Sequence, residues 1–280
     1  MTEIHHFRSL DRIHAGRETQ DGAGVRLTRI IGQSLHRRLD PFLMLDHFKS
    51  DDPEDYIKGF PEHPHRGFET LTLLQHGRMK HRDSRGNEGV ISSGGAQWMM
   101  AGRGIIHSEM PEQEKGRLEG YQLWINLPSE QKLAEPDYLD LEETEIPEIV
   151  LNEARIRVIA GRIGDCSGPL QRPVTLPLVL DIRMPKGTEV DIPIPEGHHA
   201  ALVPSQGALW VDGQTLPNCH LGILGNLGDT VRIQAQQHAR ILLIAGKPLE
   251  EAIAAYGPFV MNTEREIQDA ISDYQSGKFA

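Results

Sequence analysis

The sequence has 280 residues, of which 25% are charged and 38% hydrophobic, a composition typical of a compact globular fold rather than a disordered or membrane protein. Its 40 acidic and 29 basic residues give a formal net charge of −11, and no basic run offers a surface for phosphates, which argues against direct nucleic-acid binding. The opening residues lack an apolar leader, and the apolar run at 241–245 is too short to span a bilayer. We therefore expect a cytoplasmic protein with no membrane partner.

Short alternating segments recur along the chain and predict many β-strands. They are LTLL (71–74), GVISSG (89–94), YQLWINL (121–127), IRVIAG (156–161), LVLDIRM (178–184), ALWVDG (208–213), VRIQA (231–235) and ILLIAG (241–246). This pattern predicts an all-β fold of sandwich or barrel type. An acidic, proline-containing stretch at 133–148 with little strand pattern looks like a connector, which indicates two β-barrel lobes, at 1–135 and 136–280.

The C-terminal region changes to a helical pattern. Thr263 and Glu266 have the spacing of a capping box, and the apolar residues that follow recur every three to four positions, which predicts an amphipathic helix. A second helix is expected at 248–257, where Pro248 precedes an alanine-rich stretch that ends at Gly257. The chain should therefore end in a short helical tail.

Two short segments each offer a pair of metal-type ligands. In HPHRGFET, His63 and His65 are two residues apart, and in GRGIIHSEM the same spacing separates His107 from Glu109. Residues two apart on a strand share a face, so each pair would point to one side. Pro64 has no N–H for a β-ladder, which favours an edge strand for the first pair.

Three imidazoles and a carboxylate suit one divalent transition metal with open coordination positions. Fe(II) is favoured, while Ni, Mn, Cu, Co and Zn remain open, because a third histidine departs from the usual iron triad of two histidines and one carboxylate. Glu69 shares the face of His63 and His65, and we interpret it as a carboxylate close to the site or facing solvent rather than as a ligand. The histidines at 47, 76 and 81 are interpreted as surface or hydrogen-bonded residues without a metal role.

The segments HPHRGFET, QWMMAGRGIIHSEMP, YGPFVMNT and DYQSGKF resemble the pirin family of the cupin superfamily over nearly the whole chain. The resemblance implies a bicupin of two jelly-roll-like barrels, with one metal in the N-terminal barrel held by His63, His65, His107 and Glu109. The C-terminal barrel keeps no HxH motif, since His198 and His199 are adjacent, and is expected to bind no metal.

The same resemblance implies two alternative functions. Bacterial pirins resemble quercetin 2,3-dioxygenases, which open a flavonol ring with O2 and release carbon monoxide; Glu109 would then be both ligand and candidate catalytic base. Animal pirins resemble iron-dependent, redox-sensing co-regulators that act through protein partners. We expect the enzyme, with a small phenolic or flavonoid substrate, and a monomer because two lobes can cover each other's open faces.

Overall fold

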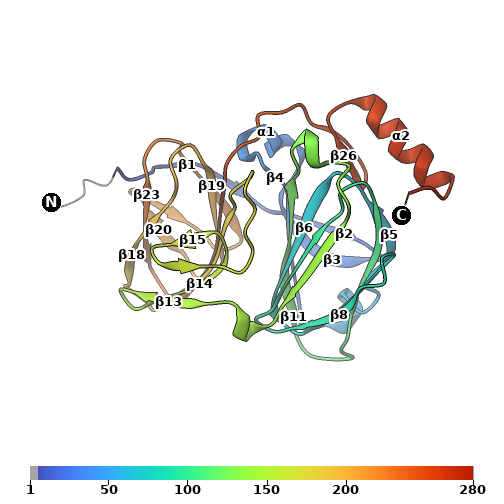
Figure 1. The fold of residues 1–280 in the computed structure, drawn as a ribbon. Helices are drawn as coiled ribbons and strands as arrows, with labels where there is room; N and C mark the ends of the chain where they lie inside the picture. Colours follow the sequence, from blue (N-terminus) through green and yellow to red (C-terminus); the bar gives the residue numbers. More distant parts are fainter. Residues whose placement is uncertain (1–5, 280) are drawn as a thin grey trace. The chain divides into compact units, whose positions relative to one another are not determined.

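A computed structural model describes residues 6–279 and divides the chain into two compact units (Figure 1). We call residues 17–36, 42–144 and 250–279 the histidine unit, and residues 6–16, 37–41 and 145–249 the apolar unit. Each unit combines segments that are distant in sequence. The predicted division at residue 135 therefore matches neither unit completely, because the C-terminal segment belongs to the histidine unit.

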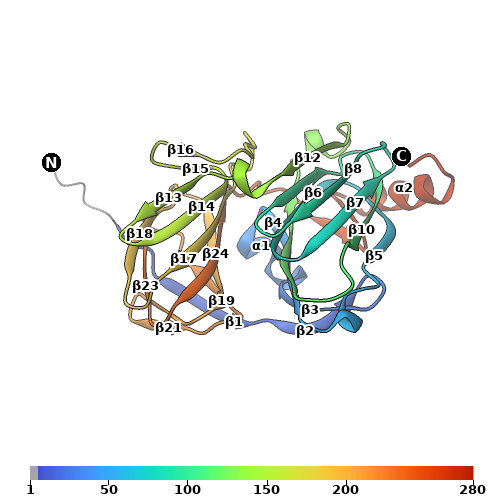
Figure 2. The same ribbon diagram turned by 90° about the horizontal axis from the view of Figure 1, so that it is seen from below.

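The histidine unit contains two main antiparallel sheets. Its seven-stranded sheet has the order β12 (Asp137–Leu141), β9 (Ala96–Met100), β6 (Phe68–His76), β11 (Leu118–Asn126), β4 (Phe42–Ser50), β3 (Val25–Ile31) and β2 (Arg17–Asp21). Its four-stranded sheet has the order β5 (Phe60–His65), β10 (Ile105–Pro111), β7 (Arg78–Asp83) and β8 (Glu88–Ser92), visible in Figure 2.

The apolar unit repeats this arrangement of seven and four strands. The larger sheet has the order β1 (Leu10–Ala15), β22 (His220–Leu224), β19 (His199–Gln206), β24 (Ala239–Gly246), β17 (Leu178–Met184), β14 (Ala154–Ala160) and β13 (Glu148–Leu151). The smaller one has the order β18 (Glu189–Pro193), β23 (Thr230–Ala235), β20 (Leu209–Val211) and β21 (Gln214–Leu216), and β15 (Arg162–Ile163) pairs with β16 (Cys166–Ser167). The predicted all-β bicupin fold is confirmed.

Alternating side chains fill the interior of the apolar unit. On β17, Leu178, Leu180 and Ile182 are all buried and belong to one continuous apolar cluster with residues of the other strands. This is the two-residue period expected where one face of a sheet covers a core. The interior of this unit is thus packed with aliphatic side chains.

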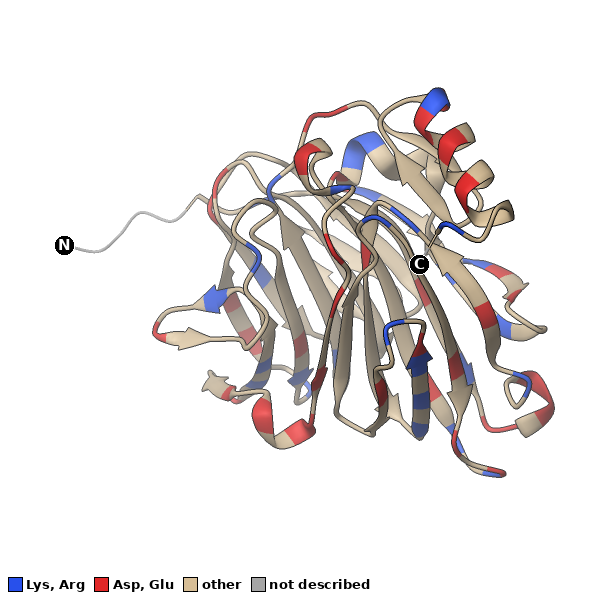
Figure 3. Ribbon diagram, turned by 45° about the vertical axis from the view of Figure 1, so that its right-hand side comes forward, with Lys and Arg blue, Asp and Glu red and all other residues tan. Residues whose placement is uncertain are grey.

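The C-terminal segment joins the histidine unit through a hairpin and a helix. Strands β25 (Ala254–Tyr256) and β26 (Phe259–Met261) pair with each other, and α2 (Glu264–Gln275) lies against them (Figure 1). The predicted capping box is confirmed, because Thr263 accepts from the Glu266 amide and Glu266 accepts from the Thr263 amide. Acidic residues recur along this helix in Figure 3.

One local prediction is wrong, and another is right only in part. The helix expected at 248–257 is absent, since Ala254–Tyr256 forms β25; pairing with β26 outweighs the helix propensity of alanine. The acidic stretch expected as a connector does contain the division between the two units, at 144/145, but it also contains β12, which pairs with β9 at the edge of the seven-stranded sheet. An edge strand tolerates charged side chains, so its alternation is weak in the sequence.

The remaining helical elements are short. They are α1 (His36–Leu39) and the 3₁₀ turns Gln33–Leu35, Pro53–Asp55, Ser129–Gln131 and Glu143–Glu145. Among residues 6–279, no helix is both long and apolar enough to span a bilayer.

Candidate metal centre

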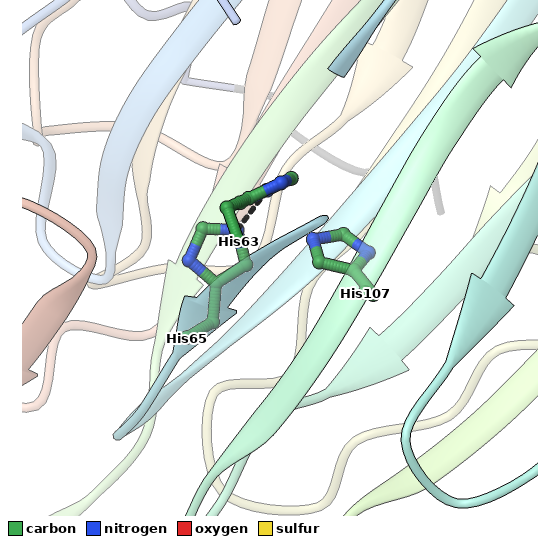
Figure 4. A group of neighbouring side chains, drawn as sticks. All are labelled: His63, His65 and His107. Atoms are coloured by element: carbon green, nitrogen blue, oxygen red, sulfur yellow. Dashed lines mark hydrogen bonds between the residues drawn. The ribbon is translucent and has the colours of Figure 1, made fainter. Parts of the chain in front are cut away.

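Strands β5 and β10 bring three predicted ligands together. His63 pairs directly with His107 across these strands, and His65 pairs with Ile105. One ring nitrogen from each of His63, His65 and His107 lies within 4.8 Å of the other two (Figure 4). β5 is an edge strand, as Pro64 predicted. Spacing along one strand and register between two strands therefore build the cluster.

The three imidazoles turn ring nitrogens toward one another, as the ligands of a metal ion do. The Nε2 atoms of His63 and His65 are 3.0 Å apart, and the Nδ1 atom of His63 lies 2.7 Å from the Pro61 carbonyl, so a donor at Nδ1 leaves its Nε2 lone pair facing the cluster. The buried Nε2 of His107 has no partner in the described chain. Burial, reinforced by the neighbouring histidines, keeps the pKa of His65 and His107 well below the ordinary value. Neutral rings with converging lone pairs fit a divalent transition metal.

His81 and Asp83 lie outside the cluster; His81 contacts His107 through the other ring nitrogen of His107, and Asp83 contacts His81. The Nδ1 atoms of His107 and His81 are 3.5 Å apart, and His81 Nε2 lies 3.4 Å from Asp83 Oδ2. If His107 donates from Nδ1 and His81 donates from Nε2, every partner is satisfied and His107 Nε2 keeps its lone pair. Asp83 is itself held by the backbone amides of Arg85 and Asn87. The sequence alone led us to interpret His81 as a residue without a metal role. The two-residue spacing of His81 and Asp83 was the signal that could have revealed its contact with the cluster.

Glu109 lies beside the cluster, buried and held at both oxygens. Gln122 Nε2 donates to its Oε2 at 3.0 Å. The Thr72 hydroxyl carries one proton and lies 2.9 Å from Glu109 Oε1 and 2.5 Å from Gln122 Oε1, so it donates to one of them at a time. Glu109 is not part of the group within 4.8 Å, and its role as a ligand stays a prediction. Glu69 is 1% exposed, so it does not face solvent.

A pocket of about 820 Å³ opens onto the cluster and is lined by His63, His65 and Glu109. This volume is within the range of small-molecule sites. Its remaining walls combine apolar and polar side chains, including Leu27, Leu43, Met44, Phe48, Phe60, Trp124, Arg29, Asp46 and Gln122. The chain therefore presents its candidate metal ligands to a cavity that can hold an organic molecule.

The C-terminal hairpin forms one wall of this pocket through Ala255, Gly257, Pro258 and Val260, a contribution that sequence reasoning missed. The buried ammonium of Lys132 holds the wall in place by donating to the Val260 carbonyl (2.9 Å), the Gly67 carbonyl and Asn126. Burial lowers the pKa of Lys132 to about 8. Gly67 has a φ of +85° and so little space beside Val260 that a Cβ would collide with its carbonyl.

Comparisons with known proteins agree with this fold. The family model described as Pirin matches residues 24–125, and the one described as Pirin C-terminal cupin domain matches residues 179–280. A pirin-like protein of Caulobacter vibrioides is 44% identical over 97% of this chain and 99% of its own length. Human pirin is 40% identical over 94% of this chain and 90% of its own length.

Among solved structures, a quercetin 2,3-dioxygenase from Acinetobacter baumannii superposes with a TM-score of 0.93 at 35% identity. The match covers 98% of this chain and 99% of that one. Two family models that together span most of the chain, and relatives of 40% identity or more over nearly its whole length, lead to one assignment. The chain belongs to the pirin family.

Proposed function

We propose that this protein is a metal-dependent dioxygenase that opens the ring of a flavonol such as quercetin with O2 and releases carbon monoxide. The observation that carries the proposal is the cluster of three imidazoles, two of which, His63 and His65, line a pocket large enough for an organic molecule. The similarity to a structure named quercetin 2,3-dioxygenase supports the same reaction.

His63, His65 and His107 would hold the metal, and Glu109 would be the fourth ligand. When bound, an Fe(II) ion supplies Lewis acidity and a one-electron couple for the reaction of an electron-rich phenol with O2. The burial of His65 and His107 matters here, because a ring kept neutral offers a lone pair at neutral pH.

The protein's own side chains would bind and orient the flavonol. Its 3-hydroxyl would be placed beside Glu109, whose carboxylate would accept the hydroxyl proton. Thr72 and Gln122 would keep that carboxylate in position by their hydrogen bonds. Trp124 and Phe60 line the pocket and would cover the aromatic rings, excluding water from the reacting carbons.

The test is to load the purified protein anaerobically with Fe(II), add quercetin and air, and follow oxygen uptake together with carbon monoxide. The expected result is one carbon monoxide per O2 consumed. His107→Ala should abolish both signals, because it removes one of the three imidazoles. His238→Ala, an exposed histidine of the apolar unit, should behave like the wild type.

No turnover despite one bound iron per chain would exclude the dioxygenase. The redox-sensing regulator would then be the hypothesis to test, by comparing protein partners of the Fe(II) and Fe(III) forms. A partner that binds one oxidation state more tightly would support it.

A further inference from the structure

A row of polar side chains crosses the large sheet of the histidine unit, one from each neighbouring strand. Arg29 on β3 pairs with Asp46 on β4, Asp46 pairs with Gln122 on β11, and Gln122 pairs with Thr72 on β6. Thr72 and Gln122 hold Glu109, so this end of the row lies at the candidate metal centre. Neighbouring strands are about 4.8 Å apart, which places Arg29 two strands, or roughly 10 Å, from Gln122.

Arg29 is fixed in one orientation. Its Nε donates to Asp46 Oδ1 at 2.9 Å, and its Nη2 donates to Asp46 Oδ2 at 2.7 Å and to Asp21 Oδ2 at 2.9 Å. These hydrogen bonds raise the pKa of Arg29, whereas burial raises the pKa of Asp46 against the effect of the arginine. The guanidinium of Arg29 therefore stays cationic. Because its hydrogen bonds to Asp46 and Asp21 already fix its orientation, Arg29 loses little further conformational entropy when it binds a ligand.

The remaining edge of the guanidinium is available for a ligand. Nη1 has no hydrogen-bond acceptor among residues 6–279, although Arg29 lines the pocket with a side chain that is 34% exposed. A buried or half-buried N–H without a protein partner favours a ligand oxygen that can accept from it. Leu43, Met44 and Trp124 line the same pocket, so apolar surface is available for the body of such a ligand.

We propose that Arg29 is a specificity-determining residue, which donates from Nη1 to a hydroxyl or phenolate oxygen on the part of a polyhydroxylated planar aromatic substrate that lies away from the metal. This inference rests on the proposed function, which identifies the end of the substrate that chelates the metal. It adds the chemical group that the protein recognises at the opposite end of the substrate. Asp46 is a positioning residue, because its two oxygens fix the guanidinium.

The test compares two flavonols that share the chelating end. Quercetin carries additional ring hydroxyls, and 3-hydroxyflavone carries none. Dissociation constants are measured anaerobically on the Fe(II)-loaded protein by calorimetry. Arg29→Met should bind quercetin about 10-fold or more weakly, since a hydrogen bond from a charged group is lost, and should bind 3-hydroxyflavone as the wild type does.

Arg26→Met is the matched control. Arg26 lies on the same strand and makes an ion pair with Asp55, but its side chain is 67% exposed and it is not among the pocket-lining residues. The Arg26→Met substitution removes the same charge from β3 and should leave the affinity for both flavonols unchanged. A loss in this variant equal to that of Arg29→Met would assign the effect to net charge and overturn the inference.

Arg29→Met leaves the buried carboxylate of Asp46 without its partner, so the variant could fold poorly. The double variant Arg29→Met/Asp46→Leu removes both charges and avoids this penalty. It should show the same selective loss of quercetin affinity. Equal affinity changes for both flavonols, or none for either, in the folded double variant would overturn the role of Arg29.

Binding and turnover separate this inference from the proposed function. Oxygen uptake by the wild type, with unchanged flavonol preference in the Arg29 variants, would overturn the specificity role and keep the dioxygenase. Selective loss of quercetin binding without any oxygen uptake by the wild type would keep the specificity role and exclude the dioxygenase.

Discussion

The two units use corresponding strands of the same sheet arrangement for opposite purposes. In the third to sixth strands of the large sheet, paired residues across the histidine unit are Thr72, Gln122, Asp46 and Arg29. The corresponding paired residues across the apolar unit are Leu202, Leu243, Leu180 and Val158. Gln122, Asp46 and Arg29 of the first row line a pocket, and Thr72 and Gln122 hydrogen-bond to Glu109. The second row is part of a continuous aliphatic core. Side-chain polarity along one row of paired residues therefore separates a barrel that contains a pocket from a packed one.

The largest effect is expected when a polar residue, of the kind found in the row of the histidine unit, replaces an aliphatic one in the row of the apolar unit. Leu243 is fully buried, so Leu243→Gln leaves an amide without partners and disturbs the packing. The free energy of unfolding should fall by about 3 to 5 kcal/mol, measured by urea denaturation. Leu227→Gln makes the same change at a residue that is 87% exposed and should alter stability by less than about 0.5 kcal/mol. A loss below about 1 kcal/mol for Leu243→Gln would mean that the apolar row does not control stability.

A second prediction concerns the residue that supports the candidate metal ligand His107 in the histidine unit. His81→Phe keeps the ring that stacks on Tyr138 at 4.6 Å but removes the acceptor for His107 Nδ1. Affinity for Fe(II) should fall about 10- to 100-fold, measured by competition with a chromophoric chelator. Nitrogen NMR of the imidazoles should also show His107 losing its preference for a proton on Nδ1. His76→Phe, at an exposed position of β6, is the control, and unchanged affinity in His81→Phe would exclude the supporting role.

The smallest effect concerns a carboxylate at the other side of β11. Burial opposes ionisation of Glu119, but the interactions with His47 and Lys49, whose side-chain nitrogens lie 3.4 and 3.1 Å from Glu119 Oε1, outweigh it and lower the pKa from 4.5 to about 2. The Glu119 carboxyl group binds its proton less tightly in the folded state than in the unfolded state. Ionised Glu119 therefore stabilises the fold above about pH 4.5, and this contribution is lost as the pH falls toward 2. Glu119→Gln should cost about 1 kcal/mol at pH 7 after allowing for solvent screening, and the difference from wild type should shrink between pH 4.5 and 2. A difference that is independent of pH in urea titrations would contradict this assignment.

The sequence predicted the features that depend on local spacing. The alternation of segments such as LVLDIRM identified strands, and the spacing of His63 with His65 placed both rings on one side of β5. The capping box at Thr263 was visible for the same reason. Residues within a few positions of each other carry their own geometry.

Features that depend on register between distant strands were missed. His81 reaches His107 only because β7 pairs with β10, and Arg29 meets Asp46 only because β3 pairs with β4. The helix expected at 248–257 was wrong for a different reason: β26 begins only three residues after β25 ends, and pairing within this hairpin outweighs the helix propensity of alanine. Glu109 stands between the two cases: its direction follows from its spacing to His107, but its hydrogen bonds come from two other strands.

The C-terminal wall of the pocket has a consequence for biosynthesis. Residues 42–144 of the histidine unit leave the ribosome before residues 145–249 of the apolar unit are made, whereas Ala255, Gly257, Pro258 and Val260 follow them. The nascent barrel therefore carries its three histidines with one side of the cavity still open. A metal ion that arrives during translation would meet an accessible cluster, and docking of the last hairpin through Lys132 would then enclose it.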